Sequence, residues 1–349
     1  MARVFVAMSG GVDSSVAAAL LLQQGHDVTG VTMRLLPSDS DIAGCCSLDG
    51  VRAAKRVCDA LGIAHYTLEF SQEFEREVIE RYCDEYAAGR TPNPCIVCND
   101  RIKFSELMRR VALQDADFLA TGHYARIVTD GSGARRLARG VDEAKDQSYF
   151  LYRMSPAQLE RTLFPIGELT KPEVRDLARS FALPTAERPE SQETCFVPGD
   201  DVRAFVRERR PEAFIAGDIL DEAGVVVGSH DGAPGFTVGQ RRGLGLSGPG
   251  RTFVTGVDVS ARTVSVGPKG ATLAETVVAS EPVWAGEPEL RVTARVRYRG
   301  AEHPAKASLR HGTLTVRFDE PIDAPAPGQA LVCWDGAIVV GGGVIEEAS

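Results

Sequence analysis

The sequence predicts an α/β protein with a doubly wound parallel sheet in its first 200 residues, followed by two small antiparallel β-barrel domains. In the first two-thirds of the chain, short apolar runs alternate with helical stretches, which is the pattern of a parallel sheet. A glycine-rich loop lies between the first apolar run and the helix after it. Beyond about Pro198, short β-rich runs are separated by Gly and Pro, which favours small barrels.

The strands of the predicted sheet are apolar runs at residues 4–8, 28–33, 65–70 and 118–121. Helices are expected at residues 15–24, 51–61 and 71–88. A later helix should begin at Thr170, which forms a capping box with Glu173. It should stop near Leu183, because Pro184 disfavours helix in the residue before it.

Strands of the second part are expected at residues 225–227, 252–259, 263–266, 291–298, 314–318 and 331–334. The alternation of apolar and polar residues in 292–298 turns one face inward and the arginines outward. A break between the two barrels is expected within residues 272–281. The predicted domains are therefore residues 1–200, 201–272 and 273–349.

Composition indicates an ordinary globular protein, since 44% of the 349 residues are hydrophobic and 25% are charged. Residues 4–8 run directly into the glycine loop without a signal-peptide cleavage site, and no apolar run is long enough to span a bilayer. We therefore expect a cytoplasmic protein without a membrane partner. Eight cysteines in that compartment favour catalytic or metal use over a disulfide framework.

The net charge of -9 argues against a nucleic-acid partner, but binding needs only a local basic patch. Between residues 291 and 310 there are six basic residues and one acid, Glu302. The basic residues are Arg291, Arg295, Arg297, Arg299, Lys306 and Arg310. This stretch either binds nucleic acid or solubilises a β surface.

The glycine loop, residues 9–15, has the sequence SGGVDSS. Its glycines let the backbone approach a ligand, and the helix behind it offers unpaired N–H groups that suit phosphate. The Ser14 hydroxyl can add a donor, and Asp13 can orient a magnesium ion or the phosphate tail. Neither the Walker A lysine nor the G-x-G-x-x-G pattern is present. Met33 ends the second strand and Gly122 follows the fourth, at the sheet edge where such folds bind ligands, although Met33 also suits a core.

Three cysteines stand out, namely Cys95 and Cys98 after a stiff Pro-Asn-Pro turn, and Cys195. Sulfur chemistry needs one thiol to carry a sulfane sulfur and another to resolve the intermediate. Alternatives are a zinc site that recruits the adjacent Cys45 and Cys46, thioredoxin-like redox chemistry, and an iron–sulfur cluster on the three thiolates. The remaining cysteines, Cys58, Cys83 and Cys333, suit buried hydrophobic positions.

The SGGVDSS loop resembles the loop of the ATP-pyrophosphatase superfamily. Further motifs stand in order along the chain. Together with the loop they are SGGVDSS at 9–15, GRTPNP at 89–94, CN at 98–99, IKF at 102–104, ATGHY at 120–124, KDQSYF at 145–150, CF at 195–196, GQRRGLG at 239–245 and GGG at 341–343. On these motifs the whole chain resembles the tRNA-specific 2-thiouridylase family.

The resemblance implies an adenine nucleotide α-hydrolase-like fold and the 2-thiolation of the wobble uridine, position 34, of tRNA. ATP, with Mg²⁺, would be bound by Ala7, Met8, Ser9, Gly10, Gly11, Val12, Asp13, Ser14, Met33 and Gly122. The target base, turned out of its stack, would meet Asn93, Pro94 and Cys95. Other tRNA contacts would come from Lys145, Asp146, Gln147, Arg297 and Tyr298. No permanently bound cofactor or metal is expected.

By the same resemblance, ATP would adenylate the uridine O2 and Cys195 would carry sulfur as a persulfide. The persulfide would come from a donor protein fed by a cysteine desulfurase. Sulfur would then attack C2, and Cys98 would act as the nucleophile that breaks the persulfide bond and forms a disulfide with Cys195. A reductant would reopen that disulfide in each cycle.

In one respect the chain departs from some members of the family, which have Asp where this chain has Cys95. That Asp is a candidate general acid/base, so the assignment of this role is open here, with Asp100 and His123 as substitutes. Two other functions also fit the ATP loop or the barrels alone. Amide formation through an adenylated carbonyl leaves the cysteines unused, and a non-catalytic RNA-binding protein leaves the ATP loop unexplained.

Overall fold

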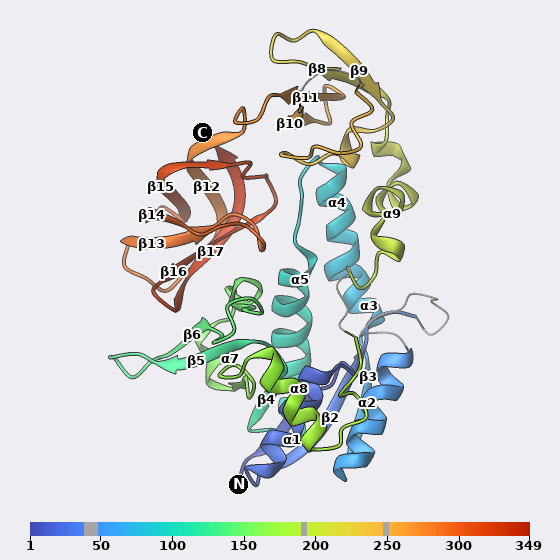
Figure 1. The fold of residues 1–349 in the computed structure, drawn as a ribbon, viewed down its shortest axis with the longest axis vertical. Helices are drawn as coiled ribbons and strands as arrows, with labels where there is room; N and C mark the ends of the chain where they lie inside the picture. Colours follow the sequence, from blue (N-terminus) through green and yellow to red (C-terminus); the bar gives the residue numbers. More distant parts are fainter. Residues whose placement is uncertain (38–47, 190–193, 247–250) are drawn as a thin grey trace. The chain divides into compact units, whose positions relative to one another are not determined.

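The computed structural model describes residues 1–37, 48–189, 194–246 and 251–349 (Figure 1). It divides into two compact units, each built from several chain segments. Unit 1 comprises Met1–Ile79, Cys95–Asp200 and Ala337–Val339, and unit 2 comprises Glu80–Pro94, Asp201–Gly336 and Val340–Ser349. Residues 80–94 thus belong with the second unit, which the sequence did not predict. Among the described residues, no helix combines the length and the apolarity needed to cross a membrane.

Unit 1 is built on a five-stranded sheet with the order β3-β2-β1-β4-β7, in which all neighbours are parallel. Its strands are β1 (Arg3–Ala7), β2 (Asp27–Arg34), β3 (His65–Glu69), β4 (Phe118–Thr121) and β7 (Thr162–Leu163). The chain builds β1, β2 and β3 outward in one direction and then returns to place β4 on the other side of β1. This confirms the predicted doubly wound sheet, and it puts the reversal of strand order between β1 and β4.

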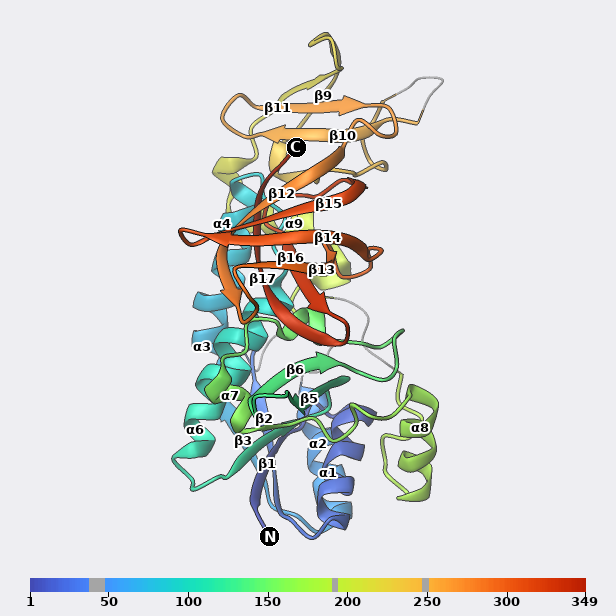
Figure 2. The ribbon, with the colours of Figure 1, turned by 90° about the vertical axis from the view of Figure 1, so that its left-hand side faces the viewer.

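Helices cover both faces of this sheet (Figure 2). On one face lie α1 (Val12–Gln23), α2 (Leu48–Leu61) and α8 (Lys171–Ser180), and on the other α3 (Ser71–Phe74) and α6 (Met108–Ala112). Helix α1 is buried along almost its whole length, including the run of alanines 17–19. Small side chains there let the helix lie close to the sheet and to α8, which packs against it.

The helices between β3 and β4 contain two π-helical segments that the sequence did not predict. The predicted helix at 71–88 consists of α3, the π-helical η1 (Glu75–Glu80) and α4 (Arg81–Ala87). After it come α5 (Pro94–Val97), the π-helical η2 (Cys98–Leu107) and α6. π-Helical turns are rare and occur frequently at functional sites. Here the second one begins at Cys98.

The last part of unit 1 carries a hairpin and short helices. Strands β5 (Ala125–Thr129) and β6 (Arg135–Arg139) pair antiparallel, and Ala138 of β6 also pairs with Ile338. A one-turn helix, α7 (Pro156–Glu160), follows. Helix α8 begins with the predicted Thr170–Glu173 capping box, which is confirmed. It ends at Ser180, earlier than predicted, and Ala182 takes a positive φ of 50°.

Unit 2 contains helix α9 (Val202–Arg209) and a four-stranded sheet of order β10-β11-β8-β9. The strands are β8 (Gly217–Leu220), β9 (Val226–His230), β10 (Phe253–Asp258) and β11 (Thr263–Gly267). The pair β8–β11 is parallel, whereas the other two pairs are antiparallel. The small core contains Ile219, Phe236 and Val254.

The remaining strands of unit 2 form a closed antiparallel barrel, as predicted. Strand β12 pairs with both β15 and β17, which closes the six strands β12 to β17 into a barrel. The strands are β12 (Leu273–Trp284), β13 (Glu289–Arg295), β14 (His303–Arg310), β15 (Thr313–Asp323), β16 (Ala330–Asp335) and β17 (Ile338–Ala348). Val292, Ala294 and Val296 are buried, as their alternation predicted. Strand β12 begins at Leu273, the first residue of the predicted third domain, and it occupies nearly all of the segment 272–281 in which a break was expected.

Candidate active site

The glycine loop connects β1 to α1, and its backbone conformation requires glycine at position 10. Gly10 has a φ of +74°, and a Cβ on it would lie 2.3 Å from the carbonyl oxygen of Gly50. The N-cap of α1 is Gly11, which has no side chain to cap the helix. The first N–H groups of α1 are therefore left for an anionic ligand.

Serine hydroxyls fold the loop onto the start of α1. The Ser9 N–H donates to Ser14 Oγ at 3.2 Å, and Ser14 and Ser15 donate to the carbonyl oxygen of Gly11 at 3.2 and 2.7 Å. Ser14 and Ser15 are buried, whereas Ser9 and Asp13 remain partly exposed. The loop is thus held in shape from inside while its outer side stays accessible.

Other predicted nucleotide residues lie at the ends of the strands around the loop. Ala7 ends β1, and the Met8 N–H donates to the Val31 carbonyl at 2.8 Å. Met33 is partly exposed near the end of β2. Gly122 follows β4, and a Cβ on it would lie 2.5 Å from the Ser14 nitrogen. The loop and Gly122 therefore meet at the reversal point of the sheet, where doubly wound folds bind ligands.

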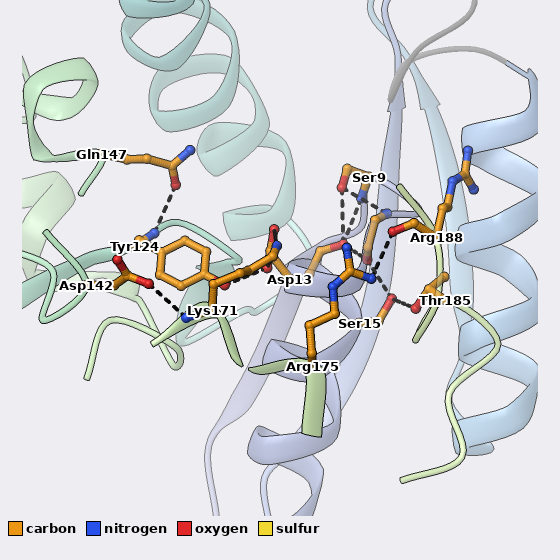
Figure 3. A network of polar contacts seen from close by, with 12 residues as sticks. Ser9, Asp13, Ser15, Tyr124, Asp142, Gln147, Lys171, Arg175, Thr185 and Arg188 are labelled. Carbon is orange, nitrogen blue, oxygen red and sulfur yellow. Dashed lines mark hydrogen bonds and ion pairs between the residues drawn. The ribbon is translucent and has the colours of Figure 1, made fainter. Parts of the chain in front are cut away.

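Asp13 is the centre of a polar cluster that the sequence did not predict (Figure 3). The Lys171 ammonium lies 2.7 and 2.9 Å from the two Asp13 carboxylate oxygens, and the Tyr124 hydroxyl donates to Oδ1 at 2.8 Å. The Lys171 backbone N–H in turn donates to the Asp142 carboxylate at 2.8 Å. A cation and a phenol thus hold the only carboxylate of the 9–15 loop.

On the other side of the loop lies the segment that leads toward Cys195 (Figure 3). The Arg188 guanidinium donates to the Gly10 carbonyl at 3.2 Å, and the buried Thr185 hydroxyl donates to Ser15 Oγ at 2.9 Å. Arg175 of α8 holds the carbonyl oxygens of Ala186 and Arg188 at 2.6 and 2.9 Å. Residues 185–188 are therefore fixed to the nucleotide loop.

His123 follows Gly122 and packs between the rings of Phe104 and Phe164, each 6.0 Å from the imidazole centre. Its Nδ1 shares a 2.7 Å hydrogen bond with the Thr121 hydroxyl. Burial, with a smaller contribution from the positive charge of Lys103, lowers the pKa of His123 well below 6.5. The neutral imidazole is therefore the stable form at neutral pH.

Of the predicted tRNA-contacting residues 145–147, Gln147 bonds to the backbone of Tyr124, and the side chains of Asp146 and Gln147 have partners inside the protein. The buried Asp146 carboxylate accepts hydrogen bonds from the N–H groups of Gly140 and Ser148 and from the Ser148 hydroxyl. Gln147 Oε1 accepts from the Tyr124 N–H at 2.9 Å. These contacts tie the 145–150 motif to the 120–124 motif. Direct contact of residues 145–147 with tRNA stays a prediction.

The three candidate cysteines differ in exposure. Cys95 in α5 is exposed, Cys98 at the start of η2 is buried with 8% of its surface exposed, and Cys195 is partly exposed. Asn99, next to Cys98, donates to the Phe150 carbonyl at 3.1 Å and accepts from Lys103 at 2.9 Å. The Cys98 motif is thereby joined to the 145–150 motif.

Cys195 is held through its neighbour Phe196, whose buried ring packs edge-on against Phe74 of α3 with the centres 5.7 Å apart. The predicted base-contacting residues Asn93 and Pro94 are partly exposed and lead into α5. The pairing of Cys195 with Cys98 stays a prediction.

The other cysteines behave as predicted. Cys58, Cys83 and Cys333 are fully buried, and burial raises the pKa of Cys58 and of Cys83 to about 11 and that of Cys333 further. Cys45 and Cys46 lie outside the described residues. Within the described part of the chain, no three His, Cys, Asp or Glu side chains are grouped as metal ligands would be.

The basic stretch of the barrel is less positive than its sequence suggested. Acids from neighbouring strands and turns pair with four of its six basic side chains. Arg291 pairs with Asp319, Arg295 with Glu302, and both Lys306 and Arg310 with Glu289. Strand β13 ends at Arg295, so the exposed Arg297 and the partly exposed Tyr298 lie in the turn after it rather than in a strand. Arg297 thus begins a turn, which its carbonyl oxygen closes by accepting from the Gly300 N–H at 3.0 Å.

Comparison with known proteins covers the whole chain. Residues 2–199 match the family model described as "tRNA methyl transferase HUP domain". Residues 203–268 match "tRNA methyl transferase PRC-barrel domain", and residues 274–345 match "Aminomethyltransferase beta-barrel domain". These descriptions mention methyl transfer, but the curated relatives carry a different name.

Three similar relatives are each named tRNA-specific 2-thiouridylase MnmA. The protein of Geobacter metallireducens is 46% identical over 99% of this chain and 97% of its own. That of Roseiflexus castenholzii is 46% identical over 99% of both chains. That of Heliobacterium modesticaldum is 47% identical over 98% of this chain and 92% of its own. The chain belongs to the tRNA-specific 2-thiouridylase family.

Proposed function

We propose that this protein is an ATP-dependent tRNA sulfurtransferase of the cytoplasm, which converts the wobble uridine, position 34, of tRNA to 2-thiouridine. The observation that carries the proposal is the loop at residues 9–15. It places uncapped helix N–H groups, two buried serine hydroxyls and Asp13 at the reversal point of the sheet. Such an arrangement suits the phosphates of a nucleotide, and the relatives of the chain are named for thiolation of tRNA.

In the first step, the uridine O2 attacks the α-phosphorus of ATP. A bond from O2 to phosphorus forms, the bond to the β-phosphate oxygen breaks, and pyrophosphate leaves. The amides at the start of α1 stabilise the negative charge that develops on the phosphates. Asp13 would orient the phosphate tail, Mg²⁺ would accompany ATP, and Ala7, Met8, Met33 and Gly122 would surround the nucleoside.

In the second step, the terminal sulfur of the Cys195 persulfide attacks C2 of the activated uridine. The C2–O2 bond breaks and AMP leaves with the former uridine oxygen. The Cys98 thiolate then attacks the Cys195 sulfur, so that the sulfur–sulfur bond to the base breaks and a Cys98–Cys195 disulfide forms. The released electron pair completes the thiocarbonyl of 2-thiouridine.

Each turnover therefore consumes one sulfane sulfur and two reducing equivalents. A persulfide-carrying protein, fed by a cysteine desulfurase, would reload Cys195 after a dithiol reductant has reopened the disulfide. Asn93, Pro94 and Cys95 would meet the extruded base, and Lys145, Asp146, Gln147, Arg297 and Tyr298 would contact the tRNA. Because His123 is neutral near pH 7, it is a hydrogen-bonding group rather than a cation for the tRNA.

Single-turnover thiolation with a Cys195→Ser variant tests the assignment of the persulfide. The variant should bind ATP and tRNA like the wild type and form no 2-thiouridine. Cys58→Ala is the control, since it removes a buried thiol that has no part in this scheme. Thiolation by Cys195→Ser at the wild-type rate would remove Cys195 from the mechanism.

A further inference from the structure

An ion pair between Asp13 and Lys171 joins the nucleotide loop to a helix that begins 158 residues further along the chain. Both carboxylate oxygens of Asp13 lie within 2.9 Å of the Lys171 ammonium, and only 12% of the lysine side chain is exposed. Exposed ion pairs add little to the stability of a fold, whereas removing a lysine charge from water costs free energy. The buried charge of Lys171 therefore points to a role in binding a ligand.

The surroundings of Lys171 fix its position. Its backbone N–H donates to Asp142, and the capping box of Thr170 and Glu173 sets the start of α8 at this residue. The ammonium lies 5.6 Å from the centre of the Tyr124 ring, and the Tyr124 hydroxyl shares the Asp13 carboxylate with it. The contacts with Asp142, Tyr124 and Asp13 therefore hold the lysine ammonium at the loop (Figure 3).

The negative charge of Asp13 would repel the phosphates of a nucleotide, and the Lys171 ammonium can offset that repulsion. A nucleotide triphosphate brings several negative charges to the loop, and two like charges 4 Å apart repel by about 4 kcal/mol at an effective dielectric constant of about 20. A cation in contact with Asp13 offsets this repulsion. The same cation also lies at the loop, where phosphate oxygens would be bound.

We propose that Lys171 is a phosphate-binding residue of this site, which Asp13 holds at the loop and which contacts the triphosphate of ATP directly. The inference rests on the proposed ATP-dependent function and adds a residue from α8 to its nucleotide site. A positioning role is the contrasting possibility, in which Lys171 only neutralises Asp13 and never touches ATP. The two roles predict different results when Asp13 itself is made neutral.

The test is equilibrium binding of ATP and of adenosine to the full-length protein, with Lys171→Gln introduced both into the wild type and into an Asp13→Asn background. A lost hydrogen bond to a charged group corresponds to roughly a 10- to 100-fold loss of ATP affinity, which we expect in both backgrounds. Adenosine affinity should stay within about twofold, because adenosine has no phosphate. Lys171→Arg should retain part of the ATP affinity.

The double variant leaves no unpaired charge in the cluster, so it stays informative if Lys171→Gln alone unfolds. Lys55→Gln is the matched control, because Lys55 forms a similar pair with Asp59, at 2.9 and 3.0 Å, and both side chains are exposed on the surface of α2. If Lys171→Gln leaves ATP affinity unchanged in the Asp13→Asn background, the lysine acts only through Asp13 and the proposal is overturned. An equal loss of ATP and adenosine affinity would overturn it too.

Failure of the Lys171 proposal and failure of the proposed function give different experimental results. A wild-type protein that binds no ATP would remove the basis of both. A wild-type protein that binds ATP with the stated dependence on Lys171, yet forms no 2-thiouridine, would contradict the proposed function alone.

Discussion

Gly122 presses against Ser14 so closely that position 122 has no room for a side chain. A Cβ there would lie 2.5 Å from the Ser14 nitrogen and 2.7 Å from the Asp13 carbonyl carbon, and both of these are backbone atoms. The end of β4 thus forms one wall of the nucleotide loop. This contact joins two parts of the chain that the sheet brings together at its reversal point.

Replacing Gly122 by Ala should therefore damage nucleotide binding. The added methyl group must push the start of α1 away, and overpacking against a rigid neighbour costs about 1–3 kcal/mol, or roughly a 10- to 100-fold loss of ATP affinity. Equilibrium ATP binding checks this. Gly131→Ala, in the turn between β5 and β6 where a Cβ would meet nothing within 4 Å, is the control. Unchanged ATP affinity in Gly122→Ala would show that the loop does not bind the nucleotide.

His123 should make the protein less stable in mild acid. Burial lowers its pKa in the folded protein from 6.5. Below pH 6.5 the imidazole therefore binds a proton in the unfolded chain but stays neutral in the folded protein. Stability should therefore fall as the pH drops below 6.5, by at most about 1.4 kcal/mol per pH unit for this one group. Thermal unfolding between about pH 7.5 and pH 5.5 checks this, with His123→Gln expected to flatten the dependence.

The exposed His311 provides the control for this measurement, since His311→Asn removes a histidine from a surface turn. It should leave the pH dependence of the wild type in place. A His123→Gln variant that loses stability in acid as steeply as the wild type would contradict the role of His123.

Arg297 should contribute more to tRNA binding than its neighbour Arg291. Arg297 is exposed at a turn, whereas Arg291 makes a two-pronged pair with Asp319 at 2.8 and 2.6 Å. A phosphate contact by Arg297 predicts that Arg297→Ala weakens binding and lowers the slope of log affinity against log salt by about 1. Titration of tRNA at several salt concentrations measures this, and Arg291→Ala is the control. Equal effects of both variants would mean that only net charge matters.

The comparison of these arginines shows what the sequence alone could not predict. The basic stretch at residues 291–310 contains one acid, but the register of the barrel brings Asp319 to Arg291, and Glu289 to Lys306 and Arg310. Hydrophobic alternation predicted β13, since it depends only on neighbours in the chain. The pairing of these basic side chains with acids depends on which strands lie next to each other. It therefore could not be predicted from neighbours along the chain.

The same distinction applies to the active site. The nucleotide loop was predicted because its glycines, serines and Asp13 are consecutive, and the capping box located the start of α8. That Lys171 reaches Asp13 depends on α8 packing against α1, which no local pattern reveals. Asp146 and Gln147 were recognised as part of a motif, but the burial of Asp146 and the internal hydrogen bonds of both side chains follow from the surrounding backbone.

Thiolation should proceed without bound iron. Cys95 is exposed while Cys98 is buried, and within the described residues no three side chains are arranged as metal ligands. Protein purified anaerobically and depleted of iron should form 2-thiouridine from a persulfide donor at the rate of the untreated protein. A rate that rises in proportion to added iron would instead favour a cluster on Cys95, Cys98 and Cys195.

The central claim is that ATP activates the uridine oxygen, which sulfur from Cys195 then displaces. It is tested most directly by labelling O2 of the wobble uridine with ¹⁸O and analysing the nucleotide products by mass spectrometry. The mechanism predicts that one ¹⁸O atom appears in AMP for each 2-thiouridine formed. Unlabelled AMP, or the release of ADP and phosphate in place of AMP and pyrophosphate, would contradict it.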